Sequence, residues 1–355
     1  MRLPINQAEE LVHALMRASG FNEGEAGTIT HHLVDCELRG AVYGGLSRAL
    51  TIAETVRALP EPSAPFCVTR QSSVSAQIDG GNSAGYLVAH HATELAITKA
   101  QQHGIGVVAV YNTWLTGMFS YYMEMATRND LVALAFGSSA WYVAPHGSNE
   151  ARFGTNPIAC GFPSTGDPVI LDIGTSAMPV GEAVLRKRLG QPLPEGWAFG
   201  PDGQPTCDPQ AALEGVFKAW GGHKGAGLAL MVQMFGLLCS DAVRPPAHKE
   251  STFLILVVRP DLFAPADAYK QAIADYAASV RAARPVGAAP VRMPFERSAA
   301  ERRQRLADGW FEVPDAIHQQ LLAQLKQADL KQPQSQSQPQ PQPQPQPARN
   351  NHGHN

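Results

Sequence analysis

Two kinds of apolar segment alternate along this chain of 355 residues, and the alternation limits the folds that the chain can adopt. The runs GIGVVAVYN, LVALAFGSS and TFLILVVRP have the length and composition of buried strands. Residues 6–38, 83–103, 221–240, 266–283 and 297–327 carry helical patterns instead. Because strands and helices interleave, we predict an α/β or α+β protein with a mixed sheet.

The composition changes near the carboxyl end. Residues 331–355 contain the run QPQSQSQPQPQPQPQP, in which Gln and Pro largely alternate. Proline cannot continue a helix or a central strand, and the run offers no apolar groups to bury. We therefore predict a disordered tail over 331–355, and the residues before it are numerous enough for two domains.

Charge and cysteine content exclude several function classes. The net charge of -3 argues against nucleic acid or an anionic membrane as the main partner. No apolar run reaches the roughly 18–20 residues that a membrane-spanning helix needs. The five cysteines form no CxxC pair, which is typical of reduced thiols. We therefore expect a cytoplasmic protein that binds neither nucleic acid nor a membrane.

The stretch DCELRGAVYGGLSRALTIAE, residues 35–54, predicts a helix, a tight turn and a second apolar segment. Arg39 and Arg48 flank the turn, which contains Tyr43-Gly44-Gly45. Two arginines beside a glycine turn are typical of a corner that binds an anion. The turn has no His, Asp, Glu, Cys or Lys that could move a proton, so the stretch alone leaves its chemical role open.

A second candidate for anion binding is GGHKGAGL, which begins at Gly221. It has neither the Rossmann nor the P-loop spacing. It does open a helix with Lys224 near its start, an arrangement that suits a phosphate or carboxylate. Close packing through the glycines is an equally good interpretation. Asp172 ends a strand, where it could face a ligand or cap the next turn.

The sequence predicts no metal site. The pairs His31-His32 and His90-His91 lie on predicted helices. Adjacent helical residues point about 100° apart, so neither pair can chelate one ion well. No paired-carboxylate signature or nucleophile elbow is present either.

Four stretches together resemble a known family. They are LRGAVYGGLSR, RFGTNPIACGFP, LPEGWAFGPDGQPTCDPQAAL and WGGHKGAGLALMVQMFGLL. Their order and spacing resemble the malate/L-lactate dehydrogenases of the non-Rossmann type, a family that includes ureidoglycolate and sulfolactate dehydrogenases, diketogulonate reductase and cyclic ketimine reductases. The resemblance covers about Ala8 to Leu325, which is nearly all of the chain before the tail.

The resemblance implies an architecture. Members are cytoplasmic homodimers that bind NAD or NADP on a mixed, largely antiparallel sheet, which is not a Rossmann fold. We accordingly expect an NAD(P)-binding-like domain over 120–296. Residues 1–119 with 297–330 would form a mainly helical domain for substrate binding and dimerisation.

The resemblance also assigns residues. It gives the substrate carboxylate to Arg48, with Thr155 and Asn156 from the GTNP motif beside it, and it makes Tyr43 and Lys224 the remaining candidates for proton transfer. The expected cofactor contacts are Asp172, Ile173, Gly174, Thr175, Ser176, His223, Lys224, Pro294 and Glu296.

The sequence departs from the family's pattern at the residues that usually carry its chemistry. Gly44 and Leu115 stand where the family has histidines, and Gly200 where it has an aspartate. Glu182 replaces a lysine and Phe295 a glycine, both near expected cofactor contacts. Phe295 could obstruct a close approach, and Glu182 adds a negative charge beside a pyrophosphate.

These features give three hypotheses. We favour an NAD(P)H-dependent reductase of a small imino or 2-oxo acid, since a preformed iminium needs little help from a proton donor. The first alternative is a non-redox lyase, cyclase or isomerase on the same scaffold, with nicotinamide binding weakened or lost. The second alternative is a catalytically silent binding homologue.

Overall fold

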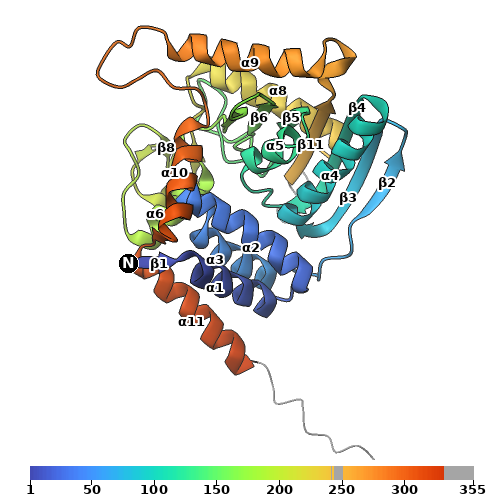
Figure 1. Ribbon diagram of the computed structural model, residues 1–355. Helices are drawn as coiled ribbons and strands as arrows, with labels where there is room; N and C mark the ends of the chain where they lie inside the picture. The colour runs from blue at the N-terminus through green and yellow to red at the C-terminus, as the bar shows by residue number, and fades with distance from the viewer. Residues whose placement is uncertain (241, 244–250, 332–355) are drawn as a thin grey trace, which may run out of the picture.

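The computed structural model describes residues 1–240, 242–243 and 251–331. Seven strands form the central sheet, in the order β2-β3-β4-β11-β5-β6-β7 (Figure 1). Within these described strands the pair β3–β4 is parallel and every other pair is antiparallel. The predicted mixed, largely antiparallel sheet is therefore confirmed. Its strands are β2 (Cys67–Gln71), β3 (Ser75–Ala84), β4 (Ile105–Trp114), β5 (Val132–Phe136), β6 (Ile158–Phe162), β7 (Val169–Ile173) and β11 (Ser251–Val258).

The pairing directions bring several strand ends to one edge. Because β11 is antiparallel to both β4 and β5, these two strands run the same way. The same argument through β6 gives β7 that direction too. The carboxyl ends of β4, β5 and β7 therefore meet at one edge of the sheet. In open sheets, ligands bind preferentially at such an edge.

Helices cover both faces of the sheet. Side chains alternate along β11, and Phe253, Ile255 and Val257 face α4 (Gly85–His103) and α5 (Phe119–Thr127) in one apolar core. The opposite face carries Phe136, which stacks on Phe235 of α8 (His223–Cys239) at 4.4 Å between ring centroids. Helix α9 (Ala266–Arg281) follows β11 in the chain and lies at the top of the view in Figure 1.

A second core belongs to a helical layer at the bottom of the view in Figure 1. Helix α2 begins at a capping box, in which the Asn22 side chain accepts from the Glu25 N–H and Glu25 bonds back to Asn22. The predicted helix over 297–327 is interrupted, because Gly309 takes the left-handed conformation and a short strand follows it. The layer comprises β1 (Arg2–Pro4), α1 (Ile5–Ala18), α2 (Glu23–Leu38), α3 (Leu46–Ala58), α10 (Glu296–Asp308), β12 (Trp310–Glu312) and α11 (Asp315–Lys331).

A third, smaller core lies beside these two layers. It joins α6 (Val180–Leu189) and α7 (Pro209–Glu214) to a three-stranded sheet. Asp208 caps α7 through its carboxylate, which accepts from the N–H groups of Gln210 and Ala211. The strands are only two residues each and were not predicted from the sequence: β8 (Ala198–Phe199), β9 (Pro205–Thr206) and β10 (Val216–Phe217).

The expected domain division at 119/120 runs through the sheet. Strands β2 to β4 precede it, whereas β5 to β7 and β11 follow it. We propose that residues 67–173, 223–240 and 251–258 belong with the sheet, that 180–217 form the smaller third unit, and that the helical layer is built mainly from 1–58 and 296–331. Residues 332–355, which hold almost all of the predicted tail, lie outside the described residues.

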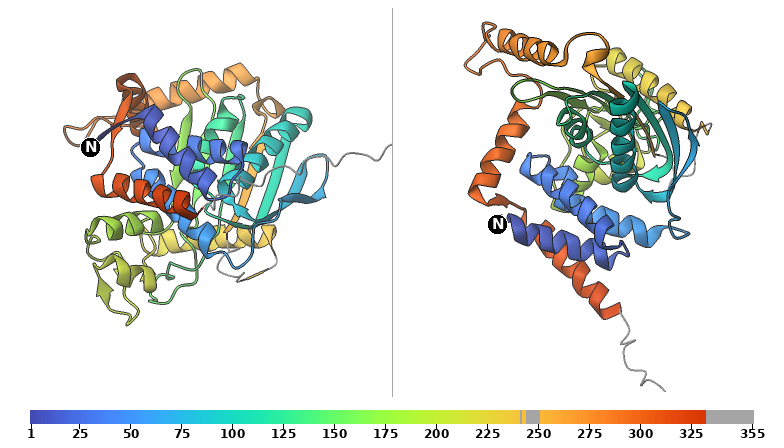
Figure 2. Two further views of the ribbon diagram at one scale, coloured as in Figure 1. Left: turned by 90° about the horizontal axis from the view of Figure 1, so that it is seen from below. Right: turned by 45° about the vertical axis from the view of Figure 1, so that its right-hand side comes forward.

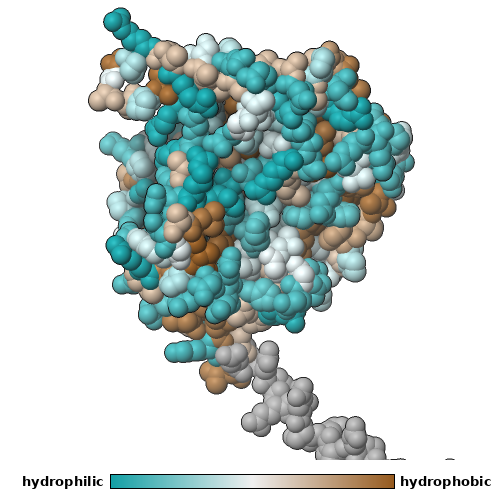
Figure 3. Space-filling view, in the orientation of Figure 1, coloured by the Kyte–Doolittle hydropathy of each residue, from teal (hydrophilic) through white to brown (hydrophobic). Residues whose placement is uncertain are grey.

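The surface in Figure 3 is mainly hydrophilic, with scattered apolar patches, and Figure 2 shows α8 at the periphery of the molecule in both views. No helix in the described ranges combines the length and the apolar character that crossing a bilayer requires. All five cysteines are free thiols, of which Cys36 and Cys239 are buried.

Candidate functional site

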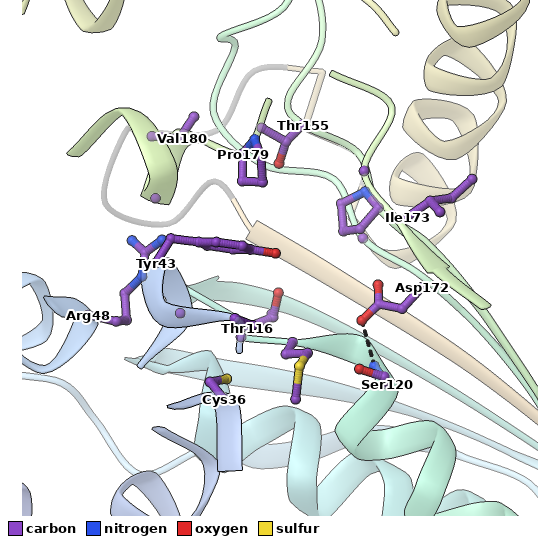
Figure 4. A pocket seen from close by; sticks show the side chains of 18 of the residues that line it. Cys36, Tyr43, Arg48, Thr116, Ser120, Thr155, Asp172, Ile173, Pro179 and Val180 are labelled. Carbon is purple, nitrogen blue, oxygen red and sulfur yellow. Dashed lines mark hydrogen bonds between the residues drawn. The ribbon is translucent and has the colours of Figure 1, made fainter. Parts of the chain in front are cut away.

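A cavity of about 1250 Å³ lies where the carboxyl edge of the sheet faces the helical layer (Figure 4). The edge contributes residues from the ends of β4, β5 and β7, including Trp114, Ser138 and Asp172. The opposite wall comes from the α2–α3 corner and the start of α6. The segment that leads into α10 adds Arg292, Met293, Pro294 and Phe295 to the lining. The cavity thus joins segments that are distant in the sequence.

The predicted helix and tight turn of residues 35–54 are confirmed, and the apolar segment that follows them is a helix. Helix α2 ends at Leu38, a short 3₁₀ helix η1 (Val42–Gly44) follows, and α3 begins at Leu46. Buried Glu37 holds the corner, since its Oε1 accepts a hydrogen bond from the Leu46 N–H at 2.7 Å. Burial raises the pKa of Glu37 to about 7. A β-carbon at Gly45 would overlap the Glu37 side chain, which explains the glycine.

Arg39 is one of the two arginines expected to bind an anion, but its guanidinium is already paired within the protein. Nε donates to Asp35 at 2.6 Å and Nη2 donates to Glu124 at 2.8 Å. The guanidinium also lies 4.6 Å from the ring centroid of Phe295. Arg302 donates to the other oxygen of Asp35 at 2.6 Å. Arg39 is therefore a structural link between α2, α5 and α10.

Arg48 differs from Arg39 in its surroundings. It lines the cavity, and no carboxylate among the described residues lies within ion-pair distance of it. Figure 4 shows its guanidinium beside the Tyr43 ring. A guanidinium without a carboxylate partner in a cavity is suited to bind one from a ligand.

Tyr43 and Asp172 face the cavity from different walls. In Figure 4 the Tyr43 hydroxyl points toward the side where Asp172 lies. Burial, with a smaller effect of the Asp172 charge, raises the pKa of Tyr43, so the phenol stays protonated. Asp172 Oδ2 accepts from the Ser120 N–H at 2.7 Å, and burial raises the pKa of this carboxyl. Asp172 borders the cavity, and the helix start to which it bonds belongs to α5, which precedes it in the chain, and not to the turn that follows it.

The expected substrate and cofactor residues divide into two groups. One group lines the cavity together with Tyr43, Arg48 and Asp172: Thr155, Ile173, Gly174, Ser176 and Pro294. The other group does not line it: Asn156, Thr175, His223, Lys224 and Glu296.

The second group has other contacts within the fold. Asn156 is buried, and its amide donates to the Ala229 carbonyl at 2.9 Å, which fixes the GTNP turn on α8. Thr175 is buried and its hydroxyl donates to the Thr155 carbonyl at 3.0 Å. The carboxylate of Glu296 accepts from the Met293 N–H at 2.8 Å and pairs with Arg281.

His223 and Lys224 begin α8 at the protein surface. The His223 ring lies edge-on to His146, with 6.1 Å between centroids. Gly221 and Gly222 before them have positive φ, which explains the glycines of this turn by backbone conformation. This favours the loop interpretation of the glycine-rich segment over a cavity ligand.

The residues expected to depart from the family pattern lie in different places. Gly44 and Leu115 line the cavity, whereas Gly200 does not. Leu115 has a φ of 51°, a left-handed conformation that is uncommon for leucine. The Glu182 carboxylate accepts from Arg186 Nε at 2.8 Å, so its charge is compensated on the same helix.

Sequence reasoning missed several lining residues, among them Cys36, Tyr86 and Thr116. It also missed His32, which does not line the cavity but contacts the lining residue Met118. Burial lowers the pKa of His32 to about 3, and its neutral Nε2 accepts from the Met118 N–H at 2.9 Å. The helical pattern of α2 could have shown that His32 faces inward, since Ile29 and Leu33 flank it. Among the described residues, no group of three or more His, Cys, Asp or Glu could hold a metal ion.

Comparisons with known proteins agree with this architecture. An L-sulfolactate dehydrogenase of Methanocaldococcus jannaschii is 30% identical over 334 residues, which cover 90% of this chain and 95% of the relative. A Delta(1)-pyrroline-2-carboxylate reductase of Ancylobacter novellus is 30% identical over 339 residues, which cover 91% and 97%.

A solved structure described as a dehydrogenase from Sinorhizobium meliloti superposes with a TM-score of 0.83 at 28% identity, covering 92% of this chain and 98% of that one. Residues 3–322 match the family model described as malate/L-lactate dehydrogenase. Because this match extends over nearly all of the described residues, the chain belongs to the malate/L-lactate dehydrogenase family.

Proposed function

We propose that the protein is an NAD(P)H-dependent reductase that adds a hydride to C2 of a small imino or 2-oxo acid. The observation that carries the proposal is the guanidinium of Arg48, which faces the cavity without a carboxylate partner among the described residues. Two relatives are named for sulfolactate and for pyrroline-2-carboxylate, which are both small carboxylic acids. Their names support a carboxylate as the ligand of Arg48. Arg48 and Thr155 are the proposed substrate contacts.

The cavity suits a dinucleotide beside a small acid. Its volume of about 1250 Å³ exceeds the roughly 300–1,000 Å³ of most small-molecule sites. Arg292 and Arg297 also line it and could balance the charge of a pyrophosphate. The proposed contacts are Ile173, Gly174, Ser176 and Pro294, and either NAD or NADP, when bound, would supply the hydride.

The proposed proton donor is Tyr43. Its raised pKa keeps the phenol protonated, so it can give a proton but is a poor base. Lys224 does not line the cavity, so we do not assign the proton transfer to it. A protonated imine places the smallest demand on a weak donor, because its nitrogen already carries the proton. An imino acid is therefore the preferred substrate class.

A second candidate is a non-redox lyase, cyclase or isomerase. It is favoured by Gly44 and Leu115, which line the cavity at the positions where the family resemblance implies histidines. General acid–base groups typically contribute about 10²- to 10⁴-fold to a rate. An enzyme without these groups would catalyse a reaction whose rate depends less on proton transfer.

Calorimetric titration of the purified protein with NADH and NADPH tests the proposal first. We expect binding of one of them, followed by loss of nicotinamide absorbance when Δ¹-piperideine-2-carboxylate is added. Absence of binding with both nucleotides would exclude the reductase. Binding without turnover of imino and 2-oxo acids would favour the silent homologue.

We also propose a homodimer in the cytoplasm. Helix α8 is apolar on its outer face as well as its inner one, and Met234 and Leu238 are 52% and 68% exposed. Exposed apolar patches of this kind mark protein interfaces. The free thiols are consistent with the proposed compartment.

A further inference from the structure

Gly181, the second residue of α6, lies against the only cavity-lining arginine that we assign to the substrate. A β-carbon built on Gly181 would overlap Nη2 of Arg48. It would also lie 3.2 Å from Cζ of Arg48 and 3.2 Å from Cδ2 of Tyr43. The hydrogen of this glycine therefore fills the space between α6 and both side chains.

The backbone does not require a glycine at this position. Gly181 has a helical conformation and is not among the described glycines with positive φ. A glycine destabilises a helix relative to alanine, because its backbone loses more conformational freedom on folding. Its presence thus points to packing, and the groups that it packs against are Arg48 and Tyr43.

We propose that Gly181 is a positioning residue that sets where the Arg48 guanidinium and the Tyr43 ring stand in the cavity. The inference rests on the proposed function for its catalytic meaning. Arg48 has no carboxylate partner among the described residues, so it is held by shape, between the Tyr43 ring and the first turn of α6. A methyl group on Gly181 would push the guanidinium away from the place where a substrate carboxylate meets it.

The cost of that methyl group falls on function rather than on folding. Nη2 is the far end of a long flexible side chain, which can move aside at little cost. The helix itself gains from alanine. Gly181→Ala should therefore leave the free energy of unfolding unchanged or slightly higher, while it weakens carboxylate binding.

Gly24→Ala is the matched control. Gly24 is also the second residue of a helix, α2, and a β-carbon there would meet only Asn22 Oδ1 at an ordinary 3.6 Å. Both variants gain the same helix propensity. They differ in whether the new methyl group meets Arg48.

The direct test is the Nε–Hε NMR signal of Arg48 in the full-length protein, identified by its absence in Arg48→Lys. We expect Gly181→Ala to move this signal and Gly24→Ala to leave it in place. An unmoved signal in Gly181→Ala would overturn the inference whether or not the protein binds a substrate.

The functional test is a double-mutant cycle with pyruvate as the probe. Gly181→Ala should weaken pyruvate binding by about ten-fold or more, the effect of losing a charge-assisted hydrogen bond. In the background of Arg48→Ala it should have no further effect. Equal losses in both backgrounds would overturn the inference. Failure of the native protein to bind pyruvate and imino acids alike would count against the proposed function, and the NMR signal would still decide the role of Gly181.

Discussion

The carboxylate of Asp172 accepts a hydrogen bond from the backbone N–H of Ser120 at 2.7 Å, so one side chain both stabilises the start of α5 and borders the cavity. We expect Asp172→Asn to keep this bond, because the amide oxygen is also an acceptor. Asp172→Ala should lose about 1 kcal/mol of unfolding free energy, as for other helix caps. Urea denaturation measures both, with Glu61→Ala, at an exposed residue between α3 and β2, as the control. Equal stability of the two Asp172 variants would contradict this role.

Arg48→Lys tests the carboxylate site. Lysine keeps the charge but loses the planar fork, so the affinity for a small 2-oxo acid should fall by roughly 1.5–3 kcal/mol. Calorimetry measures the affinity. Arg57→Lys on the exposed side of the same helix α3 should have no effect. Unchanged affinity in Arg48→Lys would show that the carboxylate binds elsewhere.

Glu37 predicts a pH dependence of stability. Its pKa is raised from 4.5 to about 7 in the folded state, so the folded protein binds the proton more tightly than the unfolded chain. The stabilisation that protonated Glu37 gives to the folded state is fully present below about pH 4.5 and is lost as the pH rises through about 7.

Glu37→Gln keeps the acceptor for the Leu46 N–H without the ionisation. We expect the variant to match the native protein at pH 5 and to exceed it at pH 8, by up to about 3 kcal/mol. Chemical denaturation at the two pH values measures this, and exposed Glu9→Gln is the control. A variant that is less stable than the native protein at pH 8 would contradict the prediction.

The native protein should oxidise malate and lactate negligibly with either nicotinamide, because no imidazole lines the described cavity. Gly44→His needs only a small adjustment, since a β-carbon there lies 3.3 Å from Cys36 Sγ. Alone it should restore little activity, whereas Gly44→His with Leu115→His should do more, because catalytic groups that act together are not additive. Nicotinamide absorbance is the assay. Robust malate or lactate turnover by the unmodified protein would disprove our interpretation of this turn.

The outer face of α8 predicts the assembly. Met231 is 52% exposed, and a charge at its position should weaken the proposed dimer by placing an ion in an apolar interface. We expect Met231→Glu to elute as a monomer in size-exclusion chromatography with light scattering. Phe263→Glu is the control, at a residue beyond β11 that is 86% exposed. A native protein that is already monomeric would contradict the proposal.

The sequence predicted the parts of the fold that have strong local signals. The runs that became β4, β5 and β11 are apolar enough to be recognised alone, helix α1 carries clear periodicity, and α8 was recognised as a long apolar run after a glycine turn. Strands β8, β9 and β10 have two residues each, too few for any alternation to be visible. The break at Gly309 was missed because a single glycine inside a helical pattern often lies within the helix.

The site was predictable only in part, because its pairings are distant in the sequence. Tyr43 and Arg48 were found from one local motif. Arg39 looked equivalent to Arg48 until Asp35, Glu124 and the Phe295 ring were seen around it. The spacing of four residues between Asp35 and Arg39 was a local sign of their pairing, whereas Glu124 lies 85 positions away and no local pattern points to it.

The pairing of β1 with β12 has a consequence for the order in which the protein folds during synthesis. Leu3 lies opposite Phe311, and both belong to the core that α1 and α3 share with Ile317 and Leu321 of α11. The faces of α1 and α3 that α11 covers therefore stay exposed to solvent until the ribosome has released β12 and α11. The central sheet can form before then, because all seven of its strands precede β12 in the sequence. Nascent chains that stop short of β12 should accordingly depend on chaperones.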